Sequence, residues 1–171
     1  PTTKTKNYGF FKKEIFSKNQ LCKVDDVYGF AILMNKIKIK KVGLFDENFF
    51  LYTEDIDLCK RLRAAGQNIY INKEAKVLHL ATKSTSIGFE FEKCRNWHWM
   101  WSKVYFNKKY SNYFFTITKF LPKLFLIFIK LIIYFLTVKN KKRTVYYYRM
   151  SGMFNALIGK KSWYRPKSID N

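Results

Sequence analysis

The chain has 171 residues, of which 48% are hydrophobic, and its 33 Lys and Arg against 12 Asp and Glu give a net charge of +21. This length allows one compact domain with its own core, and the apolar content excludes a fully disordered chain. Three widely spaced cysteines, Cys22, Cys59 and Cys94, fit neither a zinc site nor a disulfide framework and indicate a reducing compartment.

The positive charge is concentrated in the C-terminal part of the chain. Residues 102–171 hold 15 Lys and Arg against one acidic residue, whereas residues 1–101 hold 18 against 11. This excess favours an anionic partner, either nucleic acid or a membrane surface. Because the basic residues flank a very apolar run, we favour an anionic membrane surface over nucleic acid. Biased codon usage is a further explanation for the many lysines.

Residues 27–34 form a short apolar run between polar neighbours, which predicts a buried strand. Gly29 in this run marks a bulge or a close approach to a ligand, or it is a glycine tolerated beside bulky aromatic side chains. Residues 1–20 are polar and basic and predict a loop with a short helix near 11–16. Residues 1–18 have no apolar signal segment and the chain does not start with Met, so we expect it to be the remainder of a longer protein.

A helix is expected after Thr53, a residue type that caps helix N-termini. Leu58 and Leu62 recur at the spacing of one helical face, and Gly66 supplies a C-terminal stop.

Three carboxylates, Glu54, Asp55 and Asp57, fall in the first turn of this expected helix, where the helix dipole favours negative charge. A carboxylate fixed there could act as a general base and take the proton of an attacking hydroxyl group. Alternatively, all three are ordinary first-turn acids that only pair with the helix dipole. Local sequence leaves both interpretations open.

Residues 68–71 and 76–80 predict two short strands joined by a turn. His79, at the end of the second strand, could reach a metal or phosphate site or could be structural. Farther along, residues 90–106 have helical spacing, with Trp97, Trp101 and Val104 on one stripe. His98, in the same tryptophan-rich segment, is expected in the core or at an interface.

The apolar run at 114–138 raises the question of a membrane span. Its most apolar part, Leu124 to Val138, is shorter than the roughly 20 residues that a span needs, and Lys130 at its centre adds a cost of about 2.5–3.5 kcal/mol. We therefore predict a helix that lies in the membrane interface, with a true span as the alternative. Residues 146–161 predict a last amphipathic helix. The basic residues expected to reach headgroups are Lys119, Lys123, Lys130, Lys139, Lys141, Lys142 and Arg143.

One long pattern lies in the centre of the chain, and weaker pieces flank it. The long pattern is Val42-Gly43-x-Phe45-Asp46-Glu47-x-Phe49-Phe50-x-Tyr52-x-Glu54-Asp55-x-Asp57-Leu58-Cys59-x-Arg61, and the weaker pieces are Val24-Asp25-x-Val27-x-Gly29, Gly66 and Ala75-x-Val77-x-His79. Over residues 20–90, these pieces resemble the C-terminal portion of family 2 glycosyltransferases of the GT-A fold, in their rhamnosyltransferase-like branch. The position three residues after His79, often Gly in that family, is Thr82 here.

The resemblance implies an α/β fold: a partial, Rossmann-like GT-A domain with a mixed sheet, followed by C-terminal amphipathic, membrane-associated helices. Residues 1–90 would be the acceptor-side half of the catalytic domain, and residues 91–171 the helical, basic membrane-associated region. The N-terminal nucleotide-binding half of the family is not found in this sequence, so the chain alone could be inactive.

The implied activity is an inverting sugar transfer from a nucleotide-sugar to a hydroxyl of a glycan or lipid-linked acceptor, in the synthesis of cell-surface polysaccharide. The resemblance assigns the catalytic base to Asp55, with Glu54 beside it. Asp57 would be mainly structural within the substrate-binding segment. The residues assigned to substrate binding are Gly29, Asp46, Glu47, Asp57 and Arg61.

The resemblance also implies a divalent metal, Mg²⁺ or Mn²⁺, bound mainly through the N-terminal half, with His79 near the metal-bound diphosphate. The expected location is the cytoplasmic face of the bacterial inner membrane, peripheral or with one short inserted helix. The alternative function is a non-catalytic membrane-surface or interaction module left by a split gene.

Overall fold

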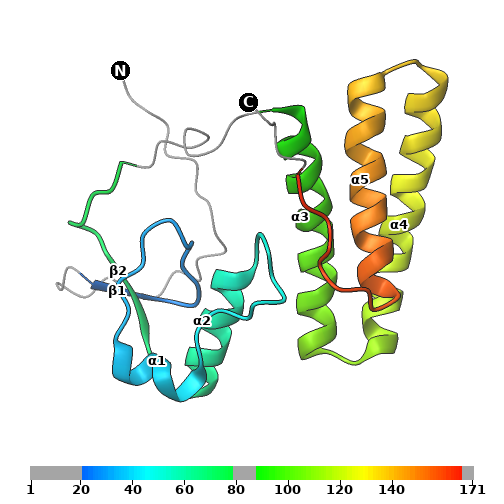
Figure 1. Cartoon of the computed structure of the whole chain (residues 1–171). Coiled ribbons are helices and arrows are strands. Elements are labelled where there is room, and N and C mark those ends of the chain that lie inside the picture. The colour runs from blue at the N-terminus through cyan, green and yellow to red at the C-terminus, as the bar shows by residue number, and fades with distance from the viewer. Residues whose placement is uncertain (1–20, 79–87, 167–171) are drawn as a thin grey trace. The chain divides into compact units, whose positions relative to one another are not determined.

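The computed structural model describes residues 21–78 and 88–166 (Figure 1). The chain divides into two compact units, which are described separately. The first comprises residues 1–45 and 55–79, and the second comprises residues 46–54 and 80–171.

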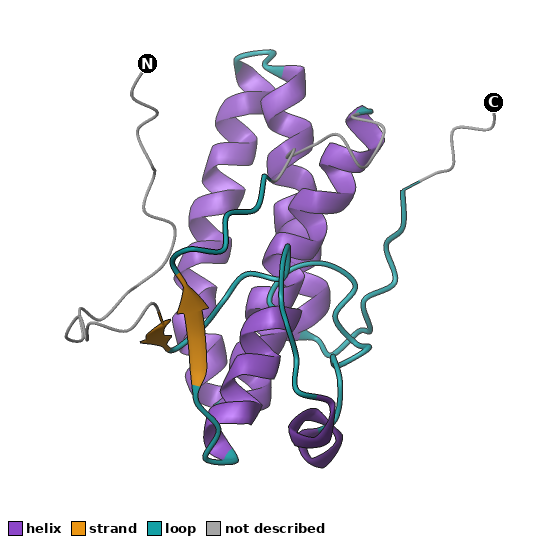
Figure 2. Ribbon diagram, turned by 90° about the vertical axis from the view of Figure 1, so that its left-hand side faces the viewer, coloured by secondary structure: helices purple, strands orange, loops and turns teal. Residues whose placement is uncertain are grey.

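The first unit pairs two short strands and carries two helices. β1 (Leu21–Val24) and β2 (Ile69–Asn72), orange in Figure 2, are antiparallel, with Leu21 opposite Asn72 and Val24 opposite Ile69. The expected α/β class agrees with this mixture of elements. In the described ranges, however, the sheet has two antiparallel strands in place of the expected mixed sheet.

α2 (Glu54–Ala64) confirms the helix expected after Thr53. It ends as Gly66 predicts: this glycine has φ +72°, and the following N–H of Gln67 donates to the carbonyl of Leu62 at 3.0 Å. Leu58 and Cys59 are buried on its inner face.

The prediction of a buried strand at 27–34 is wrong. This segment is a turn followed by irregular chain, with Phe30 and Leu33 exposed. Directly after it, the side chain of Asn35 accepts hydrogen bonds from the N–H groups of Ile37 and Lys38 and begins α1 (Lys36–Val42). An N-cap at this point starts a helix where a continuing strand would need extended backbone.

The strand predicted at 76–80 is also not formed in its described part. Residues 75–78 have no regular structure, and Leu78 is exposed. In the described ranges β2 pairs with β1, which the sequence did not predict. Residues 79 and 80, and the predicted short helix near 11–16, lie outside the described residues.

The second unit is built on three long helices, α3 (Phe89–Tyr110), α4 (Tyr113–Leu136) and α5 (Asn140–Leu157). α3 packs against α5, and α5 also packs against α4 (Figures 1 and 2). Each of the helices predicted near 90–106, 114–138 and 146–161 exists, but α5 begins six residues before the predicted start at 146. No helix in the described ranges meets the length and apolarity needed to cross a membrane.

The predicted tryptophan stripe of α3 forms the core of the helical unit. Trp97, Trp101 and Val104 are buried and cluster with Met153 of α5 and Phe120 of α4. The indole N–H of Trp101 donates to the carbonyl of Lys160 at 3.0 Å, so the chain after α5 is also fixed to α3. The stripe that the hydrophobic periodicity predicts is therefore the face of α3 that packs against the other two helices.

A single glycine sets how closely α5 approaches α3. A Cβ on Gly152 would lie 2.1 Å from the carbonyl oxygen of Trp97, and this neighbour is backbone that cannot rotate away. We therefore predict that Gly152→Ala forces the helices apart and lowers the free energy of unfolding by about 3 kcal/mol.

Thermal or urea unfolding, followed by circular dichroism, measures this effect of Gly152→Ala. The matched control is Lys141→Ala on α5. The Lys141 side chain is 75% exposed and lies 3.7 Å from Glu92, so the loss of this solvent-screened pair should change the stability by less than about 1 kcal/mol. Equal stability of the two variants would contradict the close helix contact.

Candidate functional site

Asp55 lies at the second residue of α2, and its carboxylate is held from two directions. Its Oδ2 accepts a hydrogen bond from the Gly29 N–H at 2.8 Å, and its Oδ1 accepts one from the Ile56 N–H at 2.8 Å. The residue is buried, with 9% of its surface exposed. Backbone donors and the N-terminus of α2 therefore fix the direction of this carboxylate.

Gly29 lies in a turn and contacts Asp55, the candidate base. A Cβ built on it would meet Asp55 Cβ and Oδ2 at 3.6 Å, which is ordinary van der Waals contact. The contribution of Gly29 is therefore its backbone N–H. Because a side chain would fit at this position, the contact agrees with a tolerated glycine, and the approach to a ligand stays a prediction. The two residues lie 26 positions apart in the chain.

Asp57 has a different environment from Asp55, although the two lie two positions apart. Asp57 is fully buried, and its Oδ2 accepts a 2.8 Å hydrogen bond from Nε of Arg61 one helical turn later. The same guanidinium donates to the carbonyls of Val42, Gly43 and Leu44 at 2.6, 3.0 and 2.5 Å. Asp57 and Arg61 thus hold residues 42–44, at the end of α1, on α2. Their assignment to substrate binding stays a prediction.

A second ion-pair group lies beside α2 in the same unit. Arg63 contacts Asp25 at 2.8 Å and Asp26 at 3.5 Å. Burial raises the pKa of Asp26, the Arg63 guanidinium opposes this rise, and the neighbouring carboxylates of Asp25 and Asp55 add to it. Asp26 therefore lies within electrostatic reach of the candidate base.

Asp46 and Glu47 belong to the helical unit, where Asp46 contacts α3. Its Oδ2 accepts from Lys109 Nζ at 2.7 Å and from the Tyr105 hydroxyl at 3.1 Å, and its Oδ1 accepts from the Asn48 N–H at 3.0 Å. Burial alone would raise the pKa of Asp46, but the hydrogen bonds from Lys109 and Asn48 outweigh it and lower this pKa to about 2. Asp46 is therefore ionised at neutral pH, and Glu47 is exposed.

The remaining loop residues of the motif also pack on α3. The Ser102 hydroxyl donates to the carbonyl of Leu51 at 2.7 Å, and the Phe49 and Tyr105 rings meet edge to face at 4.9 Å. The aromatic residues of the motif therefore hold the loop in place. Sequence reasoning did not find Tyr105 and Lys109, because their partner Asp46 lies about 60 positions earlier and no local spacing links them.

His98 is fully buried in α3, which confirms its predicted place in the core. Its Nε2 lies 2.8 Å from the carbonyl of Tyr164, and its ring contacts the ring of Phe50 at 4.8 Å. Burial lowers the pKa of His98 to about 4, so the ring is neutral at physiological pH and donates to Tyr164.

Two other residues were predicted at the candidate site. Glu54 is the first residue of α2 and is partly buried. His79 lies outside the described residues. Across residues 21–78 and 88–166, no three His, Cys, Asp or Glu side chains gather closely enough to hold a metal ion. The divalent metal therefore stays a prediction.

Part of this chain is similar to known proteins. It is 41% identical over 58 residues to N-acetylglucosaminyl-diphospho-decaprenol L-rhamnosyltransferase of Mycobacterium tuberculosis, in strain H37Rv and in strain CDC 1551 alike. The match covers 33% of this chain and 19% of the length of those relatives. No protein-family profile and no solved structure matches. The chain is thus similar, over a third of its length, to a glycosyltransferase.

Proposed function

We propose that this chain is the acceptor-side portion of an inverting family 2 glycosyltransferase with a GT-A catalytic domain. Its substrates would be a nucleotide-sugar and a hydroxyl of a glycan or lipid-linked acceptor. The observation that carries the proposal is the 41% identity to a rhamnosyltransferase, and the fixed carboxylate of Asp55 supplies a chemical role consistent with it. By analogy with that relative, we propose an L-rhamnosyl donor and a polyprenyl-diphosphate acceptor as the first substrates to test.

In the proposed reaction, Asp55 takes the proton of the acceptor hydroxyl as its oxygen attacks the anomeric carbon. A new glycosidic C–O bond forms on one face of the sugar while the C–O bond to the nucleoside diphosphate breaks on the other, so the anomeric configuration inverts. Each carboxylate oxygen has a second lone pair besides the one used by Gly29 or Ile56. Asp55 can therefore keep its backbone contacts and still receive the proton.

The other assigned residues have supporting roles in this proposal. Glu54 would adjust the charge beside the base, while Asp57 and Arg61 would hold residues 42–44 on α2 through their ion pair and the hydrogen bonds of Arg61. Asp46 and Glu47 keep their predicted role toward the acceptor. A divalent cation would stabilise the departing diphosphate, bound mainly by residues other than those described.

The proposal predicts a product that can be identified directly. The full-length protein, incubated with labelled nucleotide-activated L-rhamnose and polyprenyl-diphospho-N-acetylglucosamine, should transfer the label to the lipid. The product should have the opposite anomeric configuration to the donor, which NMR of the released disaccharide measures. A reaction without acceptor is the control. A retained configuration would exclude the inverting mechanism.

The second candidate is a membrane-surface module without catalysis. The specific observation in its favour is the exposed apolar surface of α4, where Phe125 and Leu136 are 62% and 72% exposed. This alternative predicts membrane binding with no transfer from any nucleotide-sugar. For either function we propose a location at the cytoplasmic face of the bacterial inner membrane.

A further inference from the structure

α4 has two apolar sides, and within the described residues of the helical unit one of them is covered. Thr116 and Phe120 are buried, and Leu124 and Ile127 pack against the core of the helical unit. The opposite side presents large apolar side chains to solvent along the whole helix. These exposed residues, called the outer face, include Phe114, Leu121, Phe125, Phe128, Ile132 and Leu136. An apolar surface of this extent marks an interaction site.

The lysines of α4 do not interrupt the outer face. Lys119, Lys123 and Lys130 are separated by four and seven residues, so they form one row along the helix. Lys119 donates to Asn107 Oδ1 at 2.6 Å on α3, and Lys130 lies 5.5 Å from the centre of the Tyr146 ring on α5. The row therefore follows the border between the outer face and the neighbouring helices.

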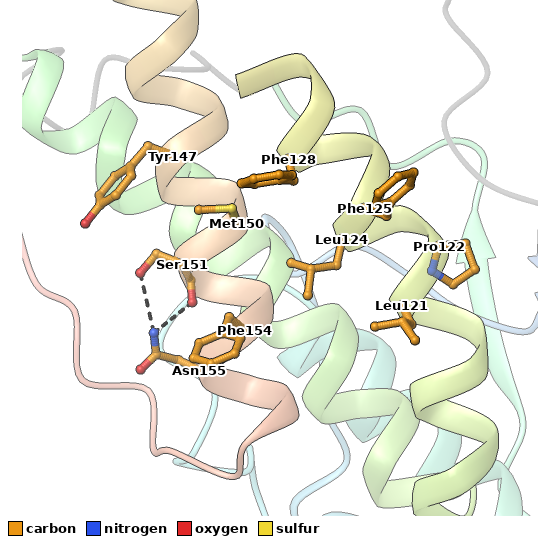
Figure 3. A pocket seen from close by; sticks show the side chains of 10 residues that line it. All are labelled: Leu121, Pro122, Leu124, Phe125, Phe128, Tyr147, Met150, Ser151, Phe154 and Asn155. Carbon is orange, nitrogen blue, oxygen red and sulfur yellow. Dashed lines mark hydrogen bonds between the residues drawn. The ribbon is translucent and has the colours of Figure 1, made fainter. Parts of the chain in front are cut away.

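A groove between α4 and α5 extends the outer face. Figure 3 shows Leu121, Phe125 and Phe128 of α4 on one side and Tyr147 and Phe154 of α5 on the other. The groove has a volume of about 910 Å³ and is lined mostly by apolar atoms. It is wide and open enough to take a flexible hydrocarbon chain.

Charge decides which occupant fits this surface. Residues 102–171 carry 15 basic residues against one acidic residue, so the outer face of one copy would be repelled by the same face of another. Besides the lysine row, Lys139, Lys141 and Lys142 are exposed where α4 turns into α5. An apolar face bordered by lysines is complementary to a bilayer whose headgroups are anionic.

We infer that the outer face of α4 docks on an anionic lipid bilayer, with the helix parallel to the surface. Its Phe, Leu and Ile side chains enter the boundary between headgroups and acyl chains, and the α4–α5 groove receives part of one acyl chain. The lysine row and the lysines of the α4–α5 turn contact lipid phosphates. This inference rests on the proposed membrane location and extends the membrane-surface candidate. It does not depend on the proposed glycosyl transfer, because it uses neither donor nor acceptor.

Vesicle sedimentation with the purified full chain tests the apolar part of the inference. The chain should bind vesicles of phosphatidylcholine and phosphatidylglycerol, and the double variant Phe125→Gln/Ile132→Gln should weaken this binding by about tenfold or more. The matched control is Leu33→Gln/Ile37→Gln, which removes two exposed apolar side chains outside the helical unit. The control should stay within about twofold of the unmodified chain.

A second pair of variants tests the charge. Replacing Lys139, Lys141 and Lys142 by Gln should weaken binding to the anionic vesicles by about tenfold or more. The same change at the exposed lysines Lys36, Lys38 and Lys40 of α1 removes equal charge and should have a much smaller effect. Added salt should reduce the difference.

Three outcomes would overturn the inference. The first is that the unmodified chain does not bind anionic vesicles. The second is that the outer-face variant and the control variant lose equal amounts of vesicle binding. The third is that the unmodified chain associates with itself but binds no vesicles, and that only the outer-face variant abolishes this self-association. The vesicles contain neither nucleotide-sugar nor acceptor. A failed sugar-transfer assay would therefore leave the vesicle-binding result unaffected. Failed vesicle binding would likewise leave the sugar-transfer result unaffected.

Discussion

Asp55→Asn in the full-length protein should lower the rate of sugar transfer by about 10²- to 10⁴-fold, the range attributed to a general base. Asparagine has nearly the same shape, and its carbonyl oxygen can still accept from the Gly29 N–H. The amide, however, cannot take a proton from the acceptor at neutral pH. Binding of the nucleotide-sugar should therefore be retained. Turnover and equilibrium binding, measured on the same preparation, separate the two effects.

Glu74→Gln is the matched control for this prediction. Glu74 is an exposed carboxylate of the same unit, next to β2 and outside the proposed machinery. Its replacement removes one negative charge and should leave turnover within about twofold. If Asp55→Asn also kept turnover within tenfold, another residue would have to be the base.

Asp57→Ala should instead act on stability, with an expected loss of about 3 kcal/mol in the free energy of unfolding. The substitution removes the buried partner of Arg61, whose guanidinium also holds the carbonyls of Val42, Gly43 and Leu44. A largely buried cation without its carboxylate is costly, and the attachment of residues 42–44 to α2 would loosen. Hydrogen exchange of the α2 amides, in the full chain, measures the loss.

Asp25→Ala provides the comparison for Asp57→Ala. Asp25 also contacts an arginine of α2, Arg63, at 2.8 Å, but its side chain is 61% exposed. Solvent screens this pair, so its loss should change stability by less than about 1 kcal/mol. Equal exchange rates in the two variants would show that burial of Asp57 does not matter. If the Asp57→Ala protein were stable but inactive in sugar transfer, Asp57 would have a role in the reaction and not a structural one.

The sequence by itself determined the features that depend on neighbours along the chain. Helical periodicity placed α2 and the Trp97–Trp101–Val104 stripe of α3, because every third or fourth residue shares one face of a helix. Gly66 marked the end of α2, since a left-handed residue is needed there. The run at 27–34 misled because an apolar composition does not specify extended backbone, and Asn35 begins a helix directly after it.

Only the tertiary structure decided which distant residues meet. Periodicity carries no information on contacts across 26 positions, as between Gly29 and Asp55, or about 60, as between Asp46 and Tyr105. Three acids of the motif consequently received different partners: two backbone N–H groups for Asp55, an arginine for Asp57, and a lysine and a tyrosine for Asp46. Likewise, packing against α3 and α5 decided which apolar side of α4 stays exposed in the described part of the chain.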